Sequence, residues 1–180
     1  MKLRHFIPCL ILSGSFWNSP LSATLPLQTV PPEIVLEGKS GSRVDTQGPW
    51  TSSSLKGKIH VLFYVAPSMK DLNKEASEAI KLEAFPTEQF GSVAVINMAA
   101  SSWPNWLLSK KLQQSQKEFP RTIYVEDRTR ELARVWKLED DSNDILVFDK
   151  EGRVIFSHDG KLSTEGVQNL VKLIRSQING

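Results

Sequence analysis

The chain of 180 residues contains 22 basic and 20 acidic residues, and Cys9 is its only cysteine. A nearly balanced charge disfavours a nucleic-acid binder, which normally keeps a basic excess. A single cysteine excludes a disulfide-rich scaffold.

The first 23 residues predict a secretory signal peptide. They have a basic start, an apolar stretch from Phe6 to Leu12, and the small residues Ser22 and Ala23 at the end. Cleavage after Ala23 removes two of the 22 basic residues and no acidic one, which leaves 20 of each sign. It also removes Cys9, so the mature chain has no thiol for a nucleophile or a metal site. We expect a periplasmic protein without a stable membrane anchor, because no later run approaches the ~20 apolar residues of a membrane span.

The mature part is predicted to be one domain with a short leading arm. Residues 24–32 are rich in proline and show no periodicity, so they either lie along the domain or remain mobile. Residues 33–180 contain no internal repeat and no second block of composition, as expected for a single domain. At their start, Ile34–Leu36 and Arg43–Asp45 flank a glycine-containing turn and predict a small N-terminal β-hairpin.

The strongest local signal is a strand followed by a helix. Ile59–Val65 is a nearly continuous run of β-branched and aromatic residues, typical of a strand buried on both faces. Pro67 ends it. Ser68 and Asp71 then form the Ser-x-x-acid pattern of a capped helix, which predicts a helix that begins at this elbow.

The rest of the chain alternates strands with helices. The predicted strands are 92–97 and 122–125, followed by a hairpin of 145–148 and 154–156; the predicted helices are 103–117, a short one around 132–136, and 163–178. This order predicts an α/β fold, a mixed β-sheet flanked by helices on both faces, with an N-terminal β-hairpin.

The same order, with Ser-Leu-Lys-Gly-Lys before the first long strand, resembles thioredoxin-like proteins of the exported thiol-oxidoreductase and peroxiredoxin branch. The resemblance places Ser68 and Asp71 where that branch has the cysteines of its Cys-x-x-Cys motif. It places 142–144 where the branch has a cis-proline. A thioredoxin-like fold without thiol-disulfide activity is therefore what the resemblance implies.

More narrowly, the chain resembles the YtfJ family of small exported bacterial proteins, whose role is poorly established. The matching segments are Gly57-Lys58, the elbow from Val65 to Asn73, Val95-Ile96-Asn97, Trp136-x-Leu138, and 147–154 with Asp159-Gly160 behind it. At the elbow the family's Gly-Arg is replaced by Pro67. Some members carry a transcriptional-regulator label, which balanced charge, export and the lack of a helix-turn-helix pattern disfavour.

Ser68, Lys70 and Asp71 are the first candidate site. The N-terminus of a helix offers free N–H groups and a positive dipole, which suit a carboxylate or phosphate. The alternatives are that Ser68 and Asp71 simply cap the helix, which we favour, or that Ser68 and Lys70 form a nucleophilic pair.

The loop 139–144 is the second candidate, because it places Asp144 and other oxygen donors near the elbow. Its spacing is not that of an EF-hand, so a solvated acidic loop is favoured over a cation site. His60 and His158 have no partner at metal-ligand spacing, and we expect no metal and no cofactor.

Trp103 and Trp106 are the third candidate. They either pack a helix on the sheet, which we favour, or form an exposed aromatic surface for a partner. Together with Ser68, Asn97 and Asp144, they would form a site if the fold brought them to one pocket.

From these patterns we expect a non-catalytic periplasmic binding module for a protein partner or a small anionic ligand, with no role for nucleic acid. The alternative is a cysteine-independent enzyme that uses Ser68 and Lys70. The identity of the ligand and the oligomeric state do not follow from the sequence.

Overall fold

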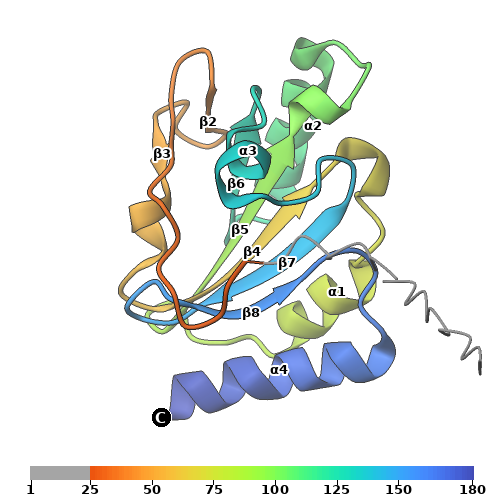
Figure 1. Ribbon diagram of the computed structural model, residues 1–180. Coiled ribbons are helices and arrows are strands. Elements are labelled where there is room, and N and C mark those ends of the chain that lie inside the picture. Colours follow the sequence, from red (N-terminus) through yellow and green to blue (C-terminus); the bar gives the residue numbers. More distant parts are fainter. Residues whose placement is uncertain (1–24) are drawn as a thin grey trace, which may run out of the picture.

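The computed structural model describes residues 25–180, so the predicted signal peptide lies outside the described residues (Figure 1). The strands are β1 (Val35–Leu36), β2 (Gly41–Arg43), β3 (Trp50–Thr51), β4 (Ile59–Val65), β5 (Phe90–Asn97), β6 (Thr122–Asp127), β7 (Asn143–Phe148) and β8 (Val154–His158). The α-helices are α1 (Lys74–Leu82), α2 (Asn105–Glu118), α3 (Glu131–Trp136) and α4 (Thr164–Asn179), and short 3₁₀ turns follow β3, β4 and β5. None of the helices in this part of the chain is long and apolar enough to cross a membrane.

Six strands form one mixed sheet in the order β2-β6-β5-β4-β7-β8. The three central strands β4, β5 and β6 are parallel, while β2, β7 and β8 pair antiparallel with their neighbours. β4 lies in the middle and all seven of its residues are buried. The predicted mixed sheet with helices on both faces is therefore confirmed, and the long apolar run is its central strand.

The N-terminal hairpin differs from the prediction in its second strand. Leu36 pairs with Trp50 and Val35 with Thr51, so β1 pairs antiparallel with β3 and not with 43–45. The predicted turn is present, since the amide of Ser40 donates to the carbonyl of Glu37 at 3.0 Å, but it leads the chain onto the edge of the main sheet. A Cβ atom on Gly41 would lie 1.9 Å from the carbonyl oxygen of Glu126, so glycine is what lets β2 approach β6.

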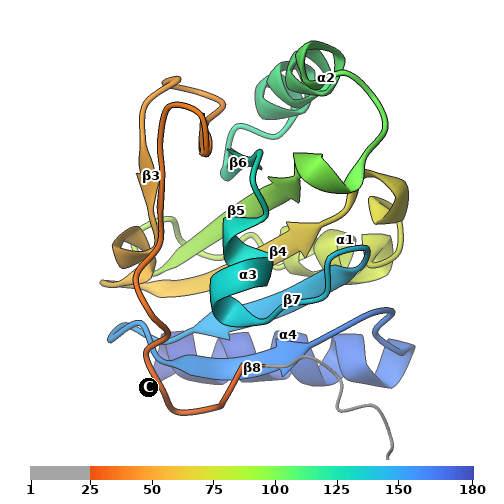
Figure 2. The same cartoon turned by 45° about the horizontal axis from the view of Figure 1, so that its top comes forward.

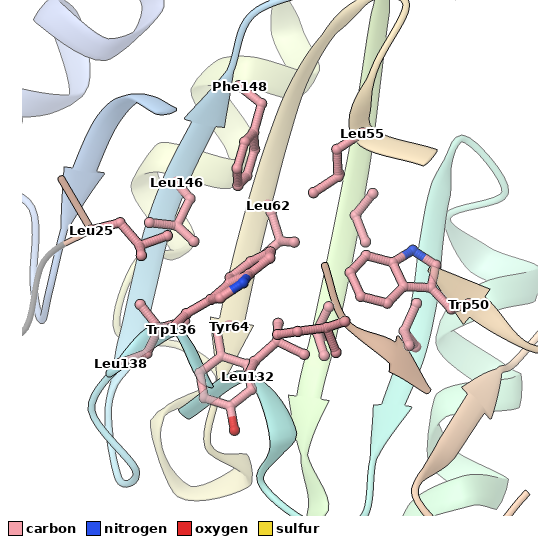
Figure 3. Packing of buried hydrophobic residues seen from close by; sticks show 14 of the residues in the cluster. Leu25, Trp50, Leu55, Leu62, Tyr64, Leu132, Trp136, Leu138, Leu146 and Phe148 are labelled. Atoms are coloured by element: carbon pink, nitrogen blue, oxygen red, sulfur yellow. The ribbon is translucent and has the colours of Figure 1, made fainter. Parts of the chain in front are cut away.

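One face of the sheet is closed by α3, the N-terminal arm and the β1–β3 pair. Trp136 of α3 packs there against Phe148, with ring centroids 5.9 Å apart, and Figure 3 shows its ring over the side chains of Leu62 and Leu146. The indole nitrogen donates to the carbonyl of Pro32 at 2.8 Å. The arm therefore lies along the domain, and we call this surface the closed face.

The other face carries α1, α4 and α2. Helices α1 and α4 pack against each other and cover β4, β7 and β8, whereas α2 lies at the opposite end of the molecule from α4 (Figures 1 and 2). The apolar face of α4 is buried through Val167, Leu170, Val171 and Ile174, as its periodicity predicts. We call this surface the helical face.

Candidate functional site: a groove between α1 and α2

A groove of about 1210 Å³ lies on the helical face between α1 and α2. This volume exceeds the upper end of the range usual for small-molecule sites, about 1,000 Å³. Its apolar lining comes from the sheet, the two helices and the turns that follow them: Phe63, Val65, Ile80, Ala84, Phe85, Phe90, Ala94, Ile96, Leu108, Leu112, Phe119 and Pro120. The groove is a large, mainly apolar concavity over the parallel strands.

The groove exists because α2 buries little of itself. Leu108 is its one buried residue, and the helix is otherwise rich in lysine, glutamine and serine. Beneath it, β5 presents the small side chains Ser92 and Ala94. A polar helix over small residues cannot fill the space that α1 and α4 fill elsewhere on this face.

Ser68, Lys70 and Asp71 line the elbow end of the groove, but they do not form the predicted cap. Only a 3₁₀ turn, Pro67–Met69, begins here, and α1 starts at Lys74. The Ser68 hydroxyl donates to Asp141 Oδ1 at 3.0 Å, and Lys70 forms an ion pair with Asp71. The favoured capping interpretation is wrong, because these side chains are already paired on the protein surface and the helix begins later.

The elbow is held instead by two buried amides that sequence reasoning missed. Asn73 Nδ2 donates to the carbonyls of Asn143 and Gly160, at 3.0 and 2.9 Å, and its Oδ1 accepts from the amide of Leu162 at 2.9 Å. Asn143 Nδ2 donates to the carbonyl of Met69 at 3.1 Å. These bonds join the start of α1, the start of β7 and the loop before α4. In the sequence the only local hint is an asparagine, Asn73, shortly after the proline of the elbow, and its partners come from distant segments.

Trp103 and Trp106 are exposed, by 49% and 70% respectively. Trp103 lines the groove, and Lys111 Nζ lies 4.3 Å from the centroid of one of its rings. Trp106 is not among the lining residues. The favoured interpretation that both tryptophans pack on the sheet is wrong, since Leu108 supplies the buried contact of this helix.

Asn97 and Asp144 do not reach the groove. Their strands alternate so that both side chains lie on the closed face, beyond Val95 and Leu146 in its core. Asn97 Nδ2 donates to the Oδ1 and carbonyl oxygen of Asp140, both at 2.7 Å. The predicted site residues therefore separate: Ser68, Lys70, Asp71 and Trp103 share the groove, while Asn97, Asp144 and Trp106 lie outside it.

Asp144 is 1% exposed, and neither carboxylate oxygen has a hydrogen-bond partner among the described residues. Burial, together with the nearby charges of Asp159 and Glu139, raises the pKa of Asp144 to about 8. The neighbouring phenol of Tyr64 donates instead to Asp127 Oδ2 at 3.3 Å. Asp127 in turn accepts from the first amides of α3, so its oxygens are satisfied.

The acidic loop 139–144 is tied to neighbouring side chains. Asp140 forms an ion pair with Arg130 at 2.6 Å, and the hydroxyl of Ser142 donates to Asp159 at 2.5 Å. Residues 25–180 contain no cluster of three or more His, Cys, Asp or Glu side chains placed to hold a metal ion. His60 is buried with Nδ1 at 3.0 Å from the carbonyl of Leu55, and burial lowers its pKa.

Comparison with known proteins places this geometry in a family. The family model described as "Bacterial protein of unknown function (YtfJ_HI0045)" matches residues 32–177. The chain belongs to this family. The uncharacterized protein YtfJ of Escherichia coli K12 is 30% identical over 129 residues, which cover 70% of each chain. An uncharacterized protein of Haemophilus influenzae is 30% identical over 172 residues, which cover 91% of each chain.

Solved structures identify the fold as thioredoxin-like. A protein assigned as thiol:disulfide interchange protein DsbE, from Chlorobium tepidum, matches 86% of this chain and 99% of its own with a TM-score of 0.64 and 16% identity. ScoI of Arabidopsis thaliana with copper bound matches 84% of this chain and 99% of its own with a TM-score of 0.59 and 15% identity. At these identities the likeness shows a shared fold and no shared activity. In this chain the fold occurs with a single cysteine in the whole sequence.

Proposed function

We propose that this protein is an exported, thioredoxin-fold binding protein that holds a ligand with an apolar body in the groove between α1 and α2. The observation that carries the proposal is the groove itself, about 1210 Å³ with a mainly apolar lining. Large concave apolar surfaces with a few polar groups at the rim are the usual form of ligand sites. The elbow, where thiol chemistry would lie in a redox-active relative, presents Ser68 at the rim of this groove.

A catalytic role for the elbow has less support. A serine–lysine nucleophilic pair needs a desolvated, neutral lysine beside the hydroxyl. Lys70 is exposed and forms an ion pair with Asp71, and the Ser68 hydroxyl points to Asp141. We therefore propose binding without catalysis and without a cofactor. A serine-reactive phosphonate that labelled Ser68 would contradict this part of the proposal.

Export is the second part of the proposal, and it rests on the sequence of the first 23 residues. Expression of the full chain in a bacterium, followed by fractionation and intact-mass measurement, tests it. The expected product is periplasmic and begins at Thr24. A cytoplasmic product of full mass would contradict it.

The binding proposal is tested with a neutral apolar dye, N-phenyl-1-naphthylamine, whose fluorescence rises in apolar surroundings. We expect the purified protein to enhance the fluorescence with saturable binding. Ser115→Trp places a large ring inside the groove from α2 and should weaken dye binding at least tenfold. Gln113→Trp is the matched control, because Gln113 is an exposed residue of the same helix outside the lining.

Two outcomes would overturn the binding proposal. One is the absence of saturable dye binding by the folded parent protein. The other is equal binding by the Ser115→Trp and Gln113→Trp variants, which would place the dye elsewhere. Circular dichroism of each variant shows that the fold is kept, and Leu112→Trp supplies a second groove variant if Ser115→Trp does not fold.

A further inference from the structure

The end of the groove away from the elbow combines positive charge with aromatic rings. Lys81 Nζ lies 5.0 Å from the centroid of the Phe119 ring, and an Arg121 Nη2 donates to the carbonyl of Phe85. Phe85 also packs against Phe90, with ring centroids 5.1 Å apart. Lys81 therefore lies beside Phe119 and Arg121 beside Phe85, and all four residues line the same groove.

These two cations have no acidic partner within residues 25–180. The other charged residues at the rim are largely paired: Lys70 with Asp71, and Lys74 with Glu78. Neither Lys81 nor Arg121 forms an ion pair in the described part of the chain, although Glu118 lines the groove near them and Glu88 lies near Arg121. Arginine has five donors, so its bond to one carbonyl leaves others for a ligand. The lining of the whole groove contains five basic and three acidic residues, so its net charge is positive.

The groove between this end and the elbow suits an unbranched apolar chain. It follows β5, whose eight residues span roughly 26 Å at ~3.3 Å per residue. Its floor is apolar at Ile96 of β5, and its sides are apolar at Ile80 of α1 and Leu108 of α2. A chain that lies here buries apolar surface, at about 25 cal/mol per Å², with no hydrogen bonds to satisfy.

An extended peptide would fit this surface less well. Extended peptides usually bind by adding a strand to a sheet edge. The strands beneath the groove are central, since β5 pairs with both β4 and β6, and their backbone groups are already used. A peptide backbone on this floor would lose hydrogen bonds to water without replacing them. An acyl chain has no such requirement.

Resting on the proposed function of the groove, we infer that its ligand is a single-chain carboxylate amphiphile, with the carboxylate between Lys81 and Arg121 and the hydrocarbon chain along β5. Charge complementarity selects the head group, and the apolar lining holds the tail. No covalent step is involved. The class includes free long-chain fatty acids.

The experiment compares three head groups on the same chain. Palmitate, hexadecanol and hexadecyltrimethylammonium are titrated below their aggregation limits against the protein with bound N-phenyl-1-naphthylamine. Palmitate is expected to displace the dye at a concentration at least tenfold lower than hexadecanol does, and the cation is expected to be the weakest. The preference for palmitate should decrease with added salt, because the cations lie at a solvent-exposed rim.

The Lys81→Gln/Arg121→Gln double variant should lose the preference for palmitate over hexadecanol while it keeps its affinity for the neutral dye. The Lys110→Gln/Lys117→Gln double variant is the matched control, because it removes two exposed positive charges of α2 outside the groove lining. It should keep the preference. Equal loss in both variants would show a general effect of charge and overturn the inference.

The two proposals fail in different ways. If the dye binds in the groove but palmitate and hexadecanol displace it equally, the carboxylate inference is wrong and the groove remains a ligand site. If neither the dye nor palmitate binds, by fluorescence and by calorimetry, both proposals are wrong. Preferential displacement by the alkylammonium would reverse the assigned charge of the head group.

Discussion

The two faces of the sheet are built from neighbouring residues of the same strands, yet they are covered to different degrees. On the closed face, Trp50, Leu62, Tyr64 and Trp136 are all at most 2% exposed. On the helical face, α1 and α4 complete a core around Ile145 and Ile174, but α2 leaves the groove open over β5. The difference indicates that stability resides mainly in the closed face and the α1–α4 pair, while α2 leaves an open groove over the sheet.

The largest expected effect is at Trp136. Trp136→Ala removes an indole that contacts Phe148 and donates to Pro32, and it leaves a cavity in a buried part of the core. We expect a loss of about 3–5 kcal/mol in the free energy of unfolding, measured by urea denaturation. Leu108→Ala, on the groove-facing side of α2, should cost about 2 kcal/mol or less, because the space it leaves opens into the existing groove. Equal losses at the two positions would contradict the contrast between the faces.

Because Asp144 is buried in the closed face, we expect the free energy of unfolding to depend on pH. Its pKa is about 8 in the folded protein and about 3.9 in the unfolded chain, so the folded state binds more protons between these values. The contribution of neutral Asp144 to the free energy of unfolding is complete below pH 4. It declines between pH 4 and pH 8, by at most about 1.4 kcal/mol per pH unit, and is lost above pH 8. Asp144→Asn should flatten this decline and make the variant more stable than the parent at pH 8.

Urea denaturation at pH 5, 6.5 and 8 measures this effect. Asp45→Asn is the control, since the Asp45 carboxylate is bonded to Arg43 and its pKa is lowered. Its removal should leave the pH dependence between 5 and 8 unchanged. A parent stability that does not fall over this range would contradict the assignment of a proton to Asp144.

The smallest expected effect on stability is at the tryptophans of α2. Trp106→Ser should change the free energy of unfolding by less than about 0.5 kcal/mol, because Trp106 is 70% exposed. Trp103→Ser should be almost as mild for stability, but it should shift dye binding because Trp103 lines the groove. Thermal denaturation and dye titration separate the two. A loss above 2 kcal/mol at Trp106 would mean that this residue is packed after all.

Predictions from the sequence were most successful where one local pattern decides the result. The buried run 59–65 is β4, and the periodic segment 163–178 is α4 within one residue at each end. They were least successful at Ser68, where the capping pattern is present but Pro67 and the bonds of Asn73 delay the helix to Lys74. At Trp106 the residue type favoured burial, but Trp106 lies off the face of α2 that carries Leu108, Leu112 and Ser115 into the groove.

The sequence by itself determined the order of the long strands and helices, the fold class, and the absence of a thiol from the chain after Cys9. These properties follow from residue identity and from periodicity over a few neighbours. Only the tertiary structure decided that Ser68 and Trp103 share a groove while Asn97 and Asp144 lie on the other face. The physical reason is that alternation along a strand gives two faces, but which elements cover each face, and how closely, depends on packing between segments far apart in the chain.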